Sequence, residues 1–531
     1  MVSAPCVIFE DEHLLAVNKP AGMNTHAPAS FAGEGIYDWL KHREPRWSRL
    51  AIIHRLDKET SGVLVFSKTG IANRSLTRQF RDQAARKTYL LLTDRAVPWK
   101  TFTAKSALAR LGGKYVERPG HAGGEMAETR FHPLESSAGR TLMEARPFTG
   151  RTHQIRVHAA ANGFPVLGDA LYGGTPAARL HLHSRDLTLH HPETGREIML
   201  SAPVDFARDI RFELRAALID ERETNAFRLV HGAGDGRPGW YVDRLGEFLL
   251  SQTAEPLTVE QRETLAAIVK AHRLSGAFHK ALIRPAGRTS IARVSQQRMP
   301  GADAPEEFII RENGLRFAMK FTEGCSVGLF LDQRDNRRRF LVNHAAADFP
   351  LFDNGPEGGE VLNTFAYTCG FSVCAARAGA RTTSIDLSKK YLEWGRRNFT
   401  LNRMESNRHE FLPGDVFDWL RRLAKKRRRF DAVVLDPPTF SRSKEHGAFQ
   451  AAKDFGRLVT SALPILKPNG VLFASTNAEK LSPERFLSGI ADAARSARRR
   501  IIQLHYAPQS PDFPIHRDEP AYLKTLWLRL A

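Results

Sequence analysis

Residues 361–386, VLNTFAYTCGFSVCAARAGARTTSID, decide the fold of the second half of this chain. The stretch opens with a short apolar run, passes through a tight loop that contains Gly370 into a helical segment, and ends in a second apolar run at Asp386. Short apolar strands that alternate with helices form a parallel sheet covered on both faces. We therefore predict a doubly wound, Rossmann-like α/β domain around this stretch.

The same pattern extends to the end of the chain. Apolar strands are predicted at 431–435 and 470–476, each with a helix before it, and the runs 500–507 and 522–530 are predicted to close the sheet as a terminal pair. The doubly wound domain is expected to occupy residues 311–531.

The first 310 residues have a different pattern and predict two further units. Short alternating or apolar runs punctuated by Gly, Asn and Asp fill residues 1–215, which predicts an α+β, mainly β domain. Few helices are expected in it, with helical patterns at 35–42 and 71–84, and HQIRVHAA (153–160) is included among its strands. Residues 216–310 combine a strand pattern with a helical stretch at 258–272, which predicts a small α/β module. The fold class is therefore multidomain.

Composition limits the function. The 531 residues carry a formal charge of +20, and a chain this basic is expected to bind a polyanion, nucleic acid first of all. No apolar stretch approaches the ~20 residues that cross a bilayer. We expect no secretion signal, because the first 20 residues lack a basic region followed by an apolar run. Four cysteines, Cys6, Cys325, Cys369 and Cys374, form neither a disulfide framework nor a zinc pattern. We expect a cytoplasmic protein with no membrane partner and no metal, and the oligomeric state stays open.

A first catalytic pattern lies at residues 52–68, IIHRLDKETSGVLVFSK, where Asp57 follows a predicted strand among Arg55, Lys58 and Thr60. Nearby cations favour an ionised carboxylate. The segment resembles the catalytic motif of the pseudouridine synthases of the large-subunit rRNA and tRNA family. The runs LLAVNKPAGM, ARKTYLLL, GRTHQIRVHAAANGFPVLGDALYGG and RLHLHSRDLTLHHP are similar to the family's other landmarks, in the family's order.

This resemblance implies that the first domain isomerises uridine to pseudouridine without a cofactor. Asp57 would be the catalytic carboxylate, and Arg55 would fill the space that the flipped nucleotide leaves in the helix. Tyr89 would lie against the uracil and serve proton transfer at carbon 5, and Arg151 would pair with Asp57. Whether Asp57 attacks the sugar, attacks the base or removes a sugar proton is left open.

A second pattern consists of aspartates at the ends of the predicted parallel strands, where ligands bind in such sheets. These are Asp386, Asp415 and Asp436, and Asp436 opens the sequence DPPTFSRSK. Together with GLFLDQRDNRR (328–338) and SIDLSKKYLEWGRRNFTLN (384–402), they resemble the class I S-adenosylmethionine (SAM)-dependent methyltransferases, and more narrowly a large-subunit rRNA methyltransferase family. Residues 224–244 are similar to the small module, an RNA-binding or linker unit, that precedes its catalytic domain.

By this resemblance the second half binds SAM. Asp386 would bind the ribose, Asp415 the adenine amine, and the 363–370 loop the methionine part. Asp436 would lie between the methyl donor and the target base, with Phe440, Pro437 and Pro438 against that base. The residues of the loop expected to contact the cofactor are Asn363, Thr364, Phe365, Tyr367 and Gly370.

The cysteines bear on which atom is methylated. Carbon 5 of cytosine is a poor nucleophile, so enzymes that methylate it first add a Cys to carbon 6. That Cys would lie in the DPP loop or just after the strand at 470–476. Every cysteine here precedes residue 375, and the strand is followed by Asn477. Cytosine is therefore disfavoured, and DPPTFSRSK with STNAEK is more similar to the guanine N7 branch. Methylation of an exocyclic amine remains an alternative.

The main hypothesis is a bifunctional RNA modification enzyme, with rRNA as the first expected substrate and tRNA as the second. One alternative is a methyltransferase that modifies an exocyclic amine or cytosine carbon 5 and whose N-terminal domain only binds RNA. Another is a ribosome-assembly factor with little turnover. Seven basic residues in RRLAKKRRR (421–429) precede the DPP strand. We expect them at the end of a helix remote from the cofactor, in contact with phosphates.

Overall fold

The computed structural model describes residues 4–119, 123–281, 296–301, 305–323, 327–443 and 447–531. Contacts divide the chain into two compact units. The first unit comprises residues 1–28, 34–40 and 49–220, and the second comprises residues 29–33, 41–48 and 221–531. Residues 221–310 thus cluster with the sheet that follows them, and their status as a separate small module stays a prediction. Cys325 lies outside the described residues.

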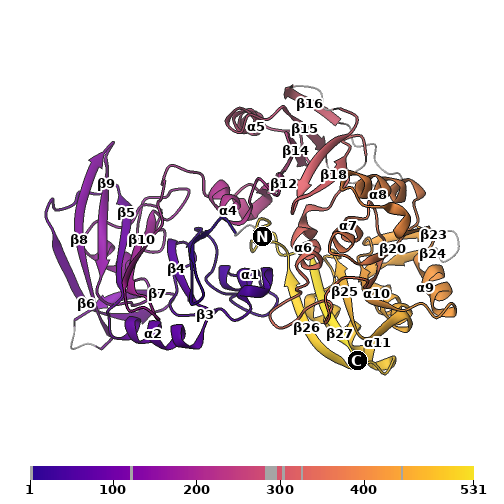
Figure 1. Ribbon diagram of the computed structural model, residues 1–531. Coiled ribbons are helices and arrows are strands. Elements are labelled where there is room, and N and C mark those ends of the chain that lie inside the picture. Colours follow the sequence, from indigo (N-terminus) through magenta and orange to yellow (C-terminus); the bar gives the residue numbers. More distant parts are fainter. Residues whose placement is uncertain (1–3, 120–122, 282–295, 302–304, 324–326, 444–446) are drawn as a thin grey trace. The chain divides into compact units, whose positions relative to one another are not determined.

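The first unit is built on one large, mostly antiparallel sheet (Figure 1). Its strand order is β1-β2-β4-β10-β5-β9-β8-β6-β7, with β3 paired to β4 and β11 paired to β10. The strands are β1 (Val7–Glu10), β2 (Leu14–Lys19), β3 (Ala51–Ile52), β4 (Ser61–Ser67), β5 (Arg86–Thr93), β6 (Phe102–Leu111), β7 (Lys114–Arg118), β8 (Glu125–Ser137), β9 (Arg140–Pro147), β10 (Leu182–His190) and β11 (Glu197–Ser201). The helices of the first 220 residues are α1 (Ile36–Arg43), α2 (Gly70–Arg81), α3 (Gln154–Ala161) and α4 (Ile210–Leu218).

Strand β4 lies between β2 and β10, and all seven of its residues are buried. It runs parallel to β10, and the two backbones approach closely at Gly62, where a Cβ atom would lie 2.2 Å from the carbonyl oxygen of Ser184. Gly62 also has a φ of +118°, a conformation open to glycine. The glycine of the TSG sequence is therefore required where it stands, directly after the Asp57 turn.

The predicted strand at 153–160 is wrong. Residues Gln154–Ala161 form helix α3, which begins after His153 in a left-handed conformation (φ 56°). Six of its eight residues are buried, so the segment lacks the one-sided apolar stripe by which a surface helix is recognised. The helices predicted at 35–42, 71–84 and 258–272 are confirmed as α1, α2 and α5 (Val259–Ala271).

The second unit opens with a small sheet in the order β12-β13-β14-β15-β16, onto which α5 packs. Its strands are β12 (Ala226–His231), β13 (Tyr241–Leu245), β14 (Phe248–Thr253), β15 (Gly276–Ala281) and β16 (Gln296–Gly301), followed by the hairpin of β17 (Phe308–Glu312) and β18 (Leu315–Met319). A short 3-10 helix, η4 (Leu331–Gln333), then leads directly into helix α6 (Arg334–Val342).

The larger sheet of this unit is the predicted doubly wound sheet. Its order is β21-β20-β19-β22-β25-β27-β26, with parallel pairing up to β25 and an antiparallel pair, β27 and β26, at the end. The strands are β19 (Glu360–Thr364), β20 (Arg381–Asp386), β21 (Glu410–Pro413), β22 (Phe430–Leu435), β25 (Leu466–Thr476), β26 (Ile501–Pro508) and β27 (Lys524–Leu530); β23 (Phe440–Ser443) and β24 (Gly447–Gln450) form a separate hairpin. The predicted terminal pair is confirmed.

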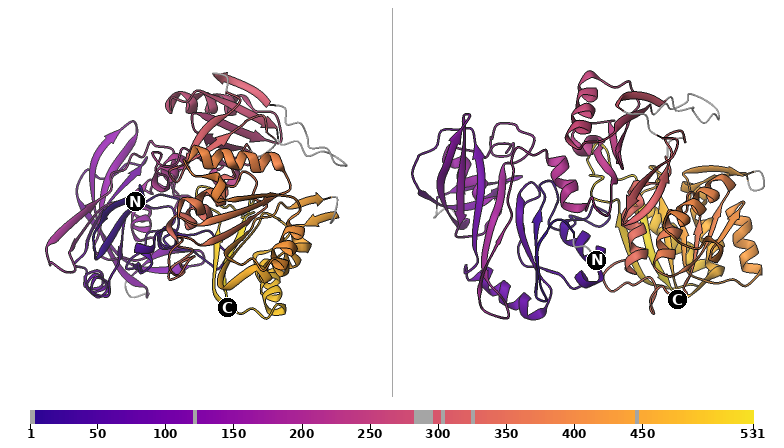
Figure 2. Two further views of the ribbon diagram at one scale, coloured as in Figure 1. Left: turned by 45° about the vertical axis from the view of Figure 1, so that its right-hand side comes forward. Right: turned by 45° about the horizontal axis from the view of Figure 1, so that its top comes forward.

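Both faces of this sheet are covered by helices, as Figure 2 shows for its orange and yellow strands. Alternate residues of one strand enter two different cores: Val471 and Phe473 pack with α7 and α8, and Leu472 and Ala474 pack with α9, α10 and α11. The helices are α7 (Gly370–Arg377), α8 (Lys389–Leu401), α9 (Val416–Lys425), α10 (Ala451–Ala462) and α11 (Pro483–Ser496). No helix in the described part of the chain is long and apolar enough to span a membrane.

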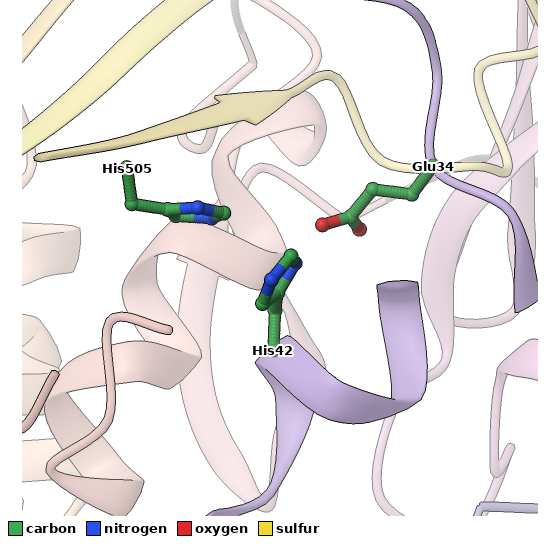
Figure 3. Close-up of side chains that lie close together, drawn as sticks. All are labelled: Glu34, His42 and His505. Atoms are coloured by element: carbon green, nitrogen blue, oxygen red, sulfur yellow. The ribbon is translucent and has the colours of Figure 1, made fainter. Parts of the chain in front are cut away.

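The second unit also holds two short segments from the N-terminal part of the sequence. The His42 and His505 rings lie next to each other, with centroids 4.3 Å apart and planes tilted by 59° (Figure 3). Glu44 forms a buried ion pair with Arg338, and the ring of Phe31 meets Tyr506 edge-on at 4.9 Å. Residues 29–33 and 41–48 are therefore part of the packing of this unit.

Candidate active sites

The first site surrounds Asp57, whose carboxylate borders two adjoining cavities of about 770 Å³ and about 100 Å³. The loop is held on both sides of Asp57. Thr25 donates from Oγ1 to the Leu56 carbonyl at 2.9 Å, and the fully buried Lys19 donates from Nζ to the Lys58 carbonyl at 3.1 Å. Burial lowers the pKa of Lys19 to about 7. These bonds fix the turn that carries the carboxylate.

The cation beside Asp57 is Arg156, which corrects the prediction for Arg151. Arg156 Nη1 lies 3.6 Å from Asp57 Oδ2, whereas Arg151 Nη1 lies 3.0 Å from Glu125 and Arg151 Nε donates to the Met126 carbonyl. Residue 151 precedes α3 and residue 156 lies within it, so the helix selects the arginine that points to the carboxylate. Arg151 nevertheless lines both cavities.

Arg156 is itself held by a second carboxylate. Its Nε and Nη2 donate to the two oxygens of Asp169 at 2.7 and 2.8 Å, and Asp169 is fully buried. Burial acts against the charged guanidinium, but the bonds with Asp169 raise the pKa of Arg156 above its ordinary value. His153 Nε2 also lies 3.8 Å from Asp57. The strand predicted where α3 lies gave Arg156 and His153 a supporting or backbone-contact role only, and Asp169 was not predicted as a site residue.

Tyr89 and Lys87 come from β5 and point into the smaller cavity, two residues apart on one face of the strand. Burial raises the pKa of Tyr89 to about 12, so its hydroxyl remains protonated near neutral pH. Burial lowers the pKa of Lys87 to about 8, and its Nζ lies 5.0 Å from the centre of the Phe80 ring. Arg55 is exposed at the same opening, so the predicted Arg55 and Tyr89 do lie with Asp57.

The assignment of Arg156, in place of Arg151, as the partner of Asp57 leads to a first prediction. Arg156→Lys keeps a positive charge but loses the paired bonds to Asp169, so we expect uridine isomerisation to fall about 100-fold at saturating RNA. Arg151→Met should change the same rate less than about threefold, because Arg151 contacts Glu125 instead. Single-turnover pseudouridine formation measures both variants. The assignment is wrong if Arg151→Met removes turnover and Arg156→Lys does not.

The second site is a cleft of about 340 Å³ at the carboxyl ends of the parallel strands. Asp386, Asp415 and Asp436, with Pro437 and Pro438, line it as predicted. Further lining residues were not predicted from the sequence: Phe330, Asp332, Gln333, Leu387, Tyr391, Gly414, Val416, Phe417, Ser441, Gly447, Phe449, Arg457, Asn477 and Leu523.

The loop after β19 contributes to the cleft through Phe365 and Tyr367. Both residues and Cys369 have left-handed backbones, with φ of 52°, 49° and 63°, a strained arrangement that is typical of functional loops. Asp386 organises the turn, because its carboxylate accepts hydrogen bonds from the backbone N–H groups of Tyr367 and Ser388, both at 2.8 Å.

Three predicted loop residues and one hairpin residue do not line the cleft. Asn363 donates to Ser372 inside the domain, and Thr364 donates to the Val434 carbonyl, because both belong to the buried strand β19. Gly370 packs instead against Leu329 and Arg337, where a Cβ atom would lie 2.9 Å from Leu329 Cδ1. Phe440 is 56 % exposed, and Phe449 from the facing strand of its hairpin lines the cleft.

Asp436 and Asp415 differ in environment. Asp436 Oδ2 accepts a hydrogen bond from Gln333 Nε2 at 3.2 Å, and burial raises the pKa of Asp436 to about 6. Asp415 caps helix α9 by accepting from the N–H groups of Phe417 and Asp418 through Oδ1. Asp415 therefore both caps helix α9 and lines the cleft.

The described cysteines are remote from chemistry in this cleft. Cys369 and Cys374 are buried, and burial raises the pKa of the Cys369 thiol to about 12 and that of Cys374 well above its usual range. Such thiols are poor nucleophiles. Neither residue lines the cleft.

The shape and polarity of the cleft suit SAM. The centroid of the Phe449 ring lies 6.0 Å from that of Phe365 and 6.1 Å from that of Phe417, and the three rings offer an apolar wall for a base. Asp386 and Asp436 supply acceptors for hydroxyl groups and negative charge for a sulfonium.

Family models match two regions of the chain. Residues 13–161 match the family model of RNA pseudouridylate synthase, and residues 288–529 match that of S-adenosylmethionine-dependent methyltransferase. A ribosomal RNA large subunit methyltransferase of Deinococcus radiodurans is 31 % identical over 62 % of this chain and 78 % of its own length. Ribosomal RNA large subunit methyltransferase I of Aeromonas hydrophila is 30 % identical over 77 % of this chain and 97 % of its own.

Among solved structures, the methyltransferase SMU.776 was crystallised in complex with SAH, the product that SAM leaves after methyl transfer. It has a TM-score of 0.52 and 27 % identity to this chain, over 65 % of this chain and 88 % of that one. The methyltransferase domain thus uses SAM as its cofactor. The chain belongs to the family of ribosomal RNA large subunit methyltransferases, and it carries an RNA pseudouridylate synthase domain ahead of its SAM-dependent methyltransferase domain.

Proposed function

We propose that this protein is a bifunctional RNA modification enzyme that isomerises uridine to pseudouridine and methylates a base, guanine N7 first of all, in large-subunit rRNA. The observation that carries the first activity is the Asp57 carboxylate at the junction of two cavities, 3.6 Å from Arg156. The names of the relatives support rRNA as the methyltransferase substrate.

In the first domain, the flipped uridine would enter the smaller cavity between Asp57 and Tyr89. Arg55, exposed at the opening, would take the vacated position in the RNA helix, because unstacking a base costs a few kcal/mol. Arg156 Nη1, 3.6 Å from Asp57 Oδ2, would orient the Asp57 carboxylate toward the nucleotide. Tyr89 stays protonated and can donate or relay a proton at carbon 5.

In the second domain, SAM supplies the methyl group, and the residues of the chain orient the acceptor base. Asp386 and Asp415 would hold the ribose and the adenine, and Asp436 with Pro437 and Pro438 would face the target. Guanine N7 attacks with its own lone pair, so no thiol or strong base is needed. The buried thiols of Cys369 and Cys374 support this choice over cytosine carbon 5.

A second candidate is methylation of an exocyclic amine. It is favoured by Asp436, whose pKa of about 6 makes it an acceptor for the proton that an amine loses. The two candidates yield different methylated nucleosides.

Mass spectrometry of nucleosides tests the proposal. Purified full-length protein is incubated with SAM and rRNA that lacks the modifications, and we expect pseudouridine and 7-methylguanosine. An N2- or N6-methylated product would support the amine alternative, and 5-methylcytidine would contradict the cysteine argument. No new modified nucleoside would leave the protein as an RNA-binding factor for these substrates.

The basic run 421–429 leads to a second prediction. It lies at the C-terminal end of α9, whose N-terminus at Asp415 borders the cleft, so the run is at the end of the helix away from the cofactor. We expect the triple variant Lys425→Gln, Lys426→Gln and Arg427→Asn to bind RNA with a shallower salt dependence. The negative slope of the logarithm of the RNA association constant against the logarithm of the salt concentration should shrink in magnitude by about two. Asparagine suits the left-handed backbone of Arg427 (φ 53°).

Titration of RNA binding between low and high salt measures this slope. The matched control is Arg485→Gln, Arg495→Gln and Arg498→Asn around α11, which removes the same charge and again places Asn at a left-handed residue (φ 56°). Equal slopes for both triple variants would mean that the run acts only through net charge.

A further inference from the structure

Asp332 is an acidic residue of the cofactor cleft that the predicted roles do not use. It lies in η4, between the buried Leu331 and Gln333, and lines the cleft together with Asp436. Tyr522 donates its hydroxyl to Asp332 Oδ2 at 2.9 Å. Among the described residues, no hydrogen-bond donor contacts the other carboxylate oxygen. Asp332 therefore offers the cleft an oriented oxygen.

The next residue in the chain, Gln333, orients the carboxyl group of Asp436. The Gln333 amide donates to Asp436 Oδ2 at 3.2 Å and to Ser475 Oγ at 2.8 Å, and its carbonyl accepts from Asn336 at 2.8 Å. These three bonds fix the amide between the ends of β22 and β25. Two carboxyl groups that line the cleft, those of Asp332 and Asp436, are thus held by neutral donors.

The nearby cations are already engaged by other acids. Arg337 donates to both oxygens of Glu312 at 2.7 Å, and Arg228 pairs with Asp243 at 2.5 Å. No lysine or arginine in the described part of the chain forms an ion pair with Asp332 or Asp436. Burial raises the pKa of both carboxyl groups, and the charge of Asp332 raises the pKa of Asp436 further. The charge of Arg337 acts against this at both residues, and that of Arg228 does so at Asp332, but the net shift is upward at both. A cation bound in the cleft would therefore stabilise their charged forms.

SAM brings such a cation, and its product does not. The sulfur of SAM is a positively charged sulfonium, whereas the sulfur of S-adenosylhomocysteine (SAH) is neutral once the methyl group has left. We propose that Asp332, together with Asp436, binds the sulfonium end of SAM and makes the site prefer SAM to SAH. This role rests on the cofactor alone and is independent of the base that is methylated. It would favour release of SAH after each methyl transfer.

Calorimetric titration of the full-length protein with SAM, SAH and sinefungin tests the proposal without RNA. Sinefungin carries an amine in place of the methylsulfonium and is cationic near neutral pH. For Asp332→Asn we expect the Kd for SAM and for sinefungin to rise at least about tenfold, and the Kd for SAH to change less than about twofold.

Two further variants keep the result interpretable. Tyr522→Phe retains both carboxylates and should keep the wild-type ratio of SAM to SAH affinity within about threefold. Asp492→Asn removes an exposed carboxylate from α11 and should leave all three affinities unchanged. The proposal is overturned if Asp332→Asn weakens SAM and SAH equally, which would point to the ammonium group that both ligands share, or if it changes neither.

Discussion

Replacing Asp57 with asparagine is expected to abolish pseudouridine formation, with a loss of about 10⁴-fold or more. Asparagine has the same shape but cannot ionise, so it can neither form a covalent bond to the nucleotide nor accept a proton. Because Asp57 borders the cavities and is about one-third exposed, the substitution should leave the fold intact. Quantification of pseudouridine in rRNA treated with each variant measures the loss.

Two controls separate chemistry from binding. Asp205→Asn changes an exposed aspartate outside both cavities of the same unit and should leave isomerisation at the wild-type rate. Methyl transfer by Asp57→Asn should remain within about threefold of wild type. If Asp57→Asn still forms pseudouridine, another group does the chemistry; if wild type forms none on rRNA that it binds, the domain is an RNA-binding module.

The sequence predicts the architecture well wherever apolar periodicity is regular. The strands of the doubly wound sheet are buried runs between helices, and even the antiparallel β26 and β27 could be inferred from two late apolar segments. The rule that ligands bind at the carboxyl ends of parallel strands placed Asp386, Asp415 and Asp436 correctly at the cleft.

The partner of Asp57 could not be inferred because it depends on one local choice between strand and helix. HQIRVHAA alternates well enough to suggest a strand, but its residues are buried on all sides, and a left-handed His153 starts a helix without a side-chain cap. That helix brings Arg156 to Asp57 and leaves Arg151 with Glu125. The sequence alone does not show which of these two arginines reaches Asp57, because that depends on the backbone between them.

The sequence-based prediction of the residues that line the cofactor cleft was incomplete for a different reason. Asn363 and Thr364 belong to β19, whose side chains are covered by neighbouring strands and helices, and the loop that is open to a ligand begins only at Phe365. Asp332 and Tyr522 come from segments about 190 residues apart in the sequence, yet they meet through one hydrogen bond. No periodicity or spacing signals such a long-range pair.

Replacing Asp436 with asparagine is expected to lower methyl transfer at least about 100-fold, because the negative charge beside the reacting centre is lost. The pKa of Asp436 is about 6, so the wild-type rate should rise as the pH increases through 6 and level off above it, if the ionised form is the active one. Single-turnover methyl transfer between pH 5 and 8 measures this profile. Asp492→Asn should retain both the rate and the profile.

The same substitution should stabilise the second unit at neutral pH. The carboxyl group ionises at about 6 in the folded protein and near 3.8 in the unfolded chain, so its charge opposes folding by about 3 kcal/mol once both states are ionised. Below pH 4 both states are protonated and the penalty vanishes. The stability gained by Asp436→Asn should therefore grow from pH 4 to 6 and stay constant above 6, as followed by thermal unfolding without SAM. An unchanged or lower unfolding temperature at pH 7.5 would show that the buried charge is already compensated, and that the cleft does not hold it ready for a cationic ligand.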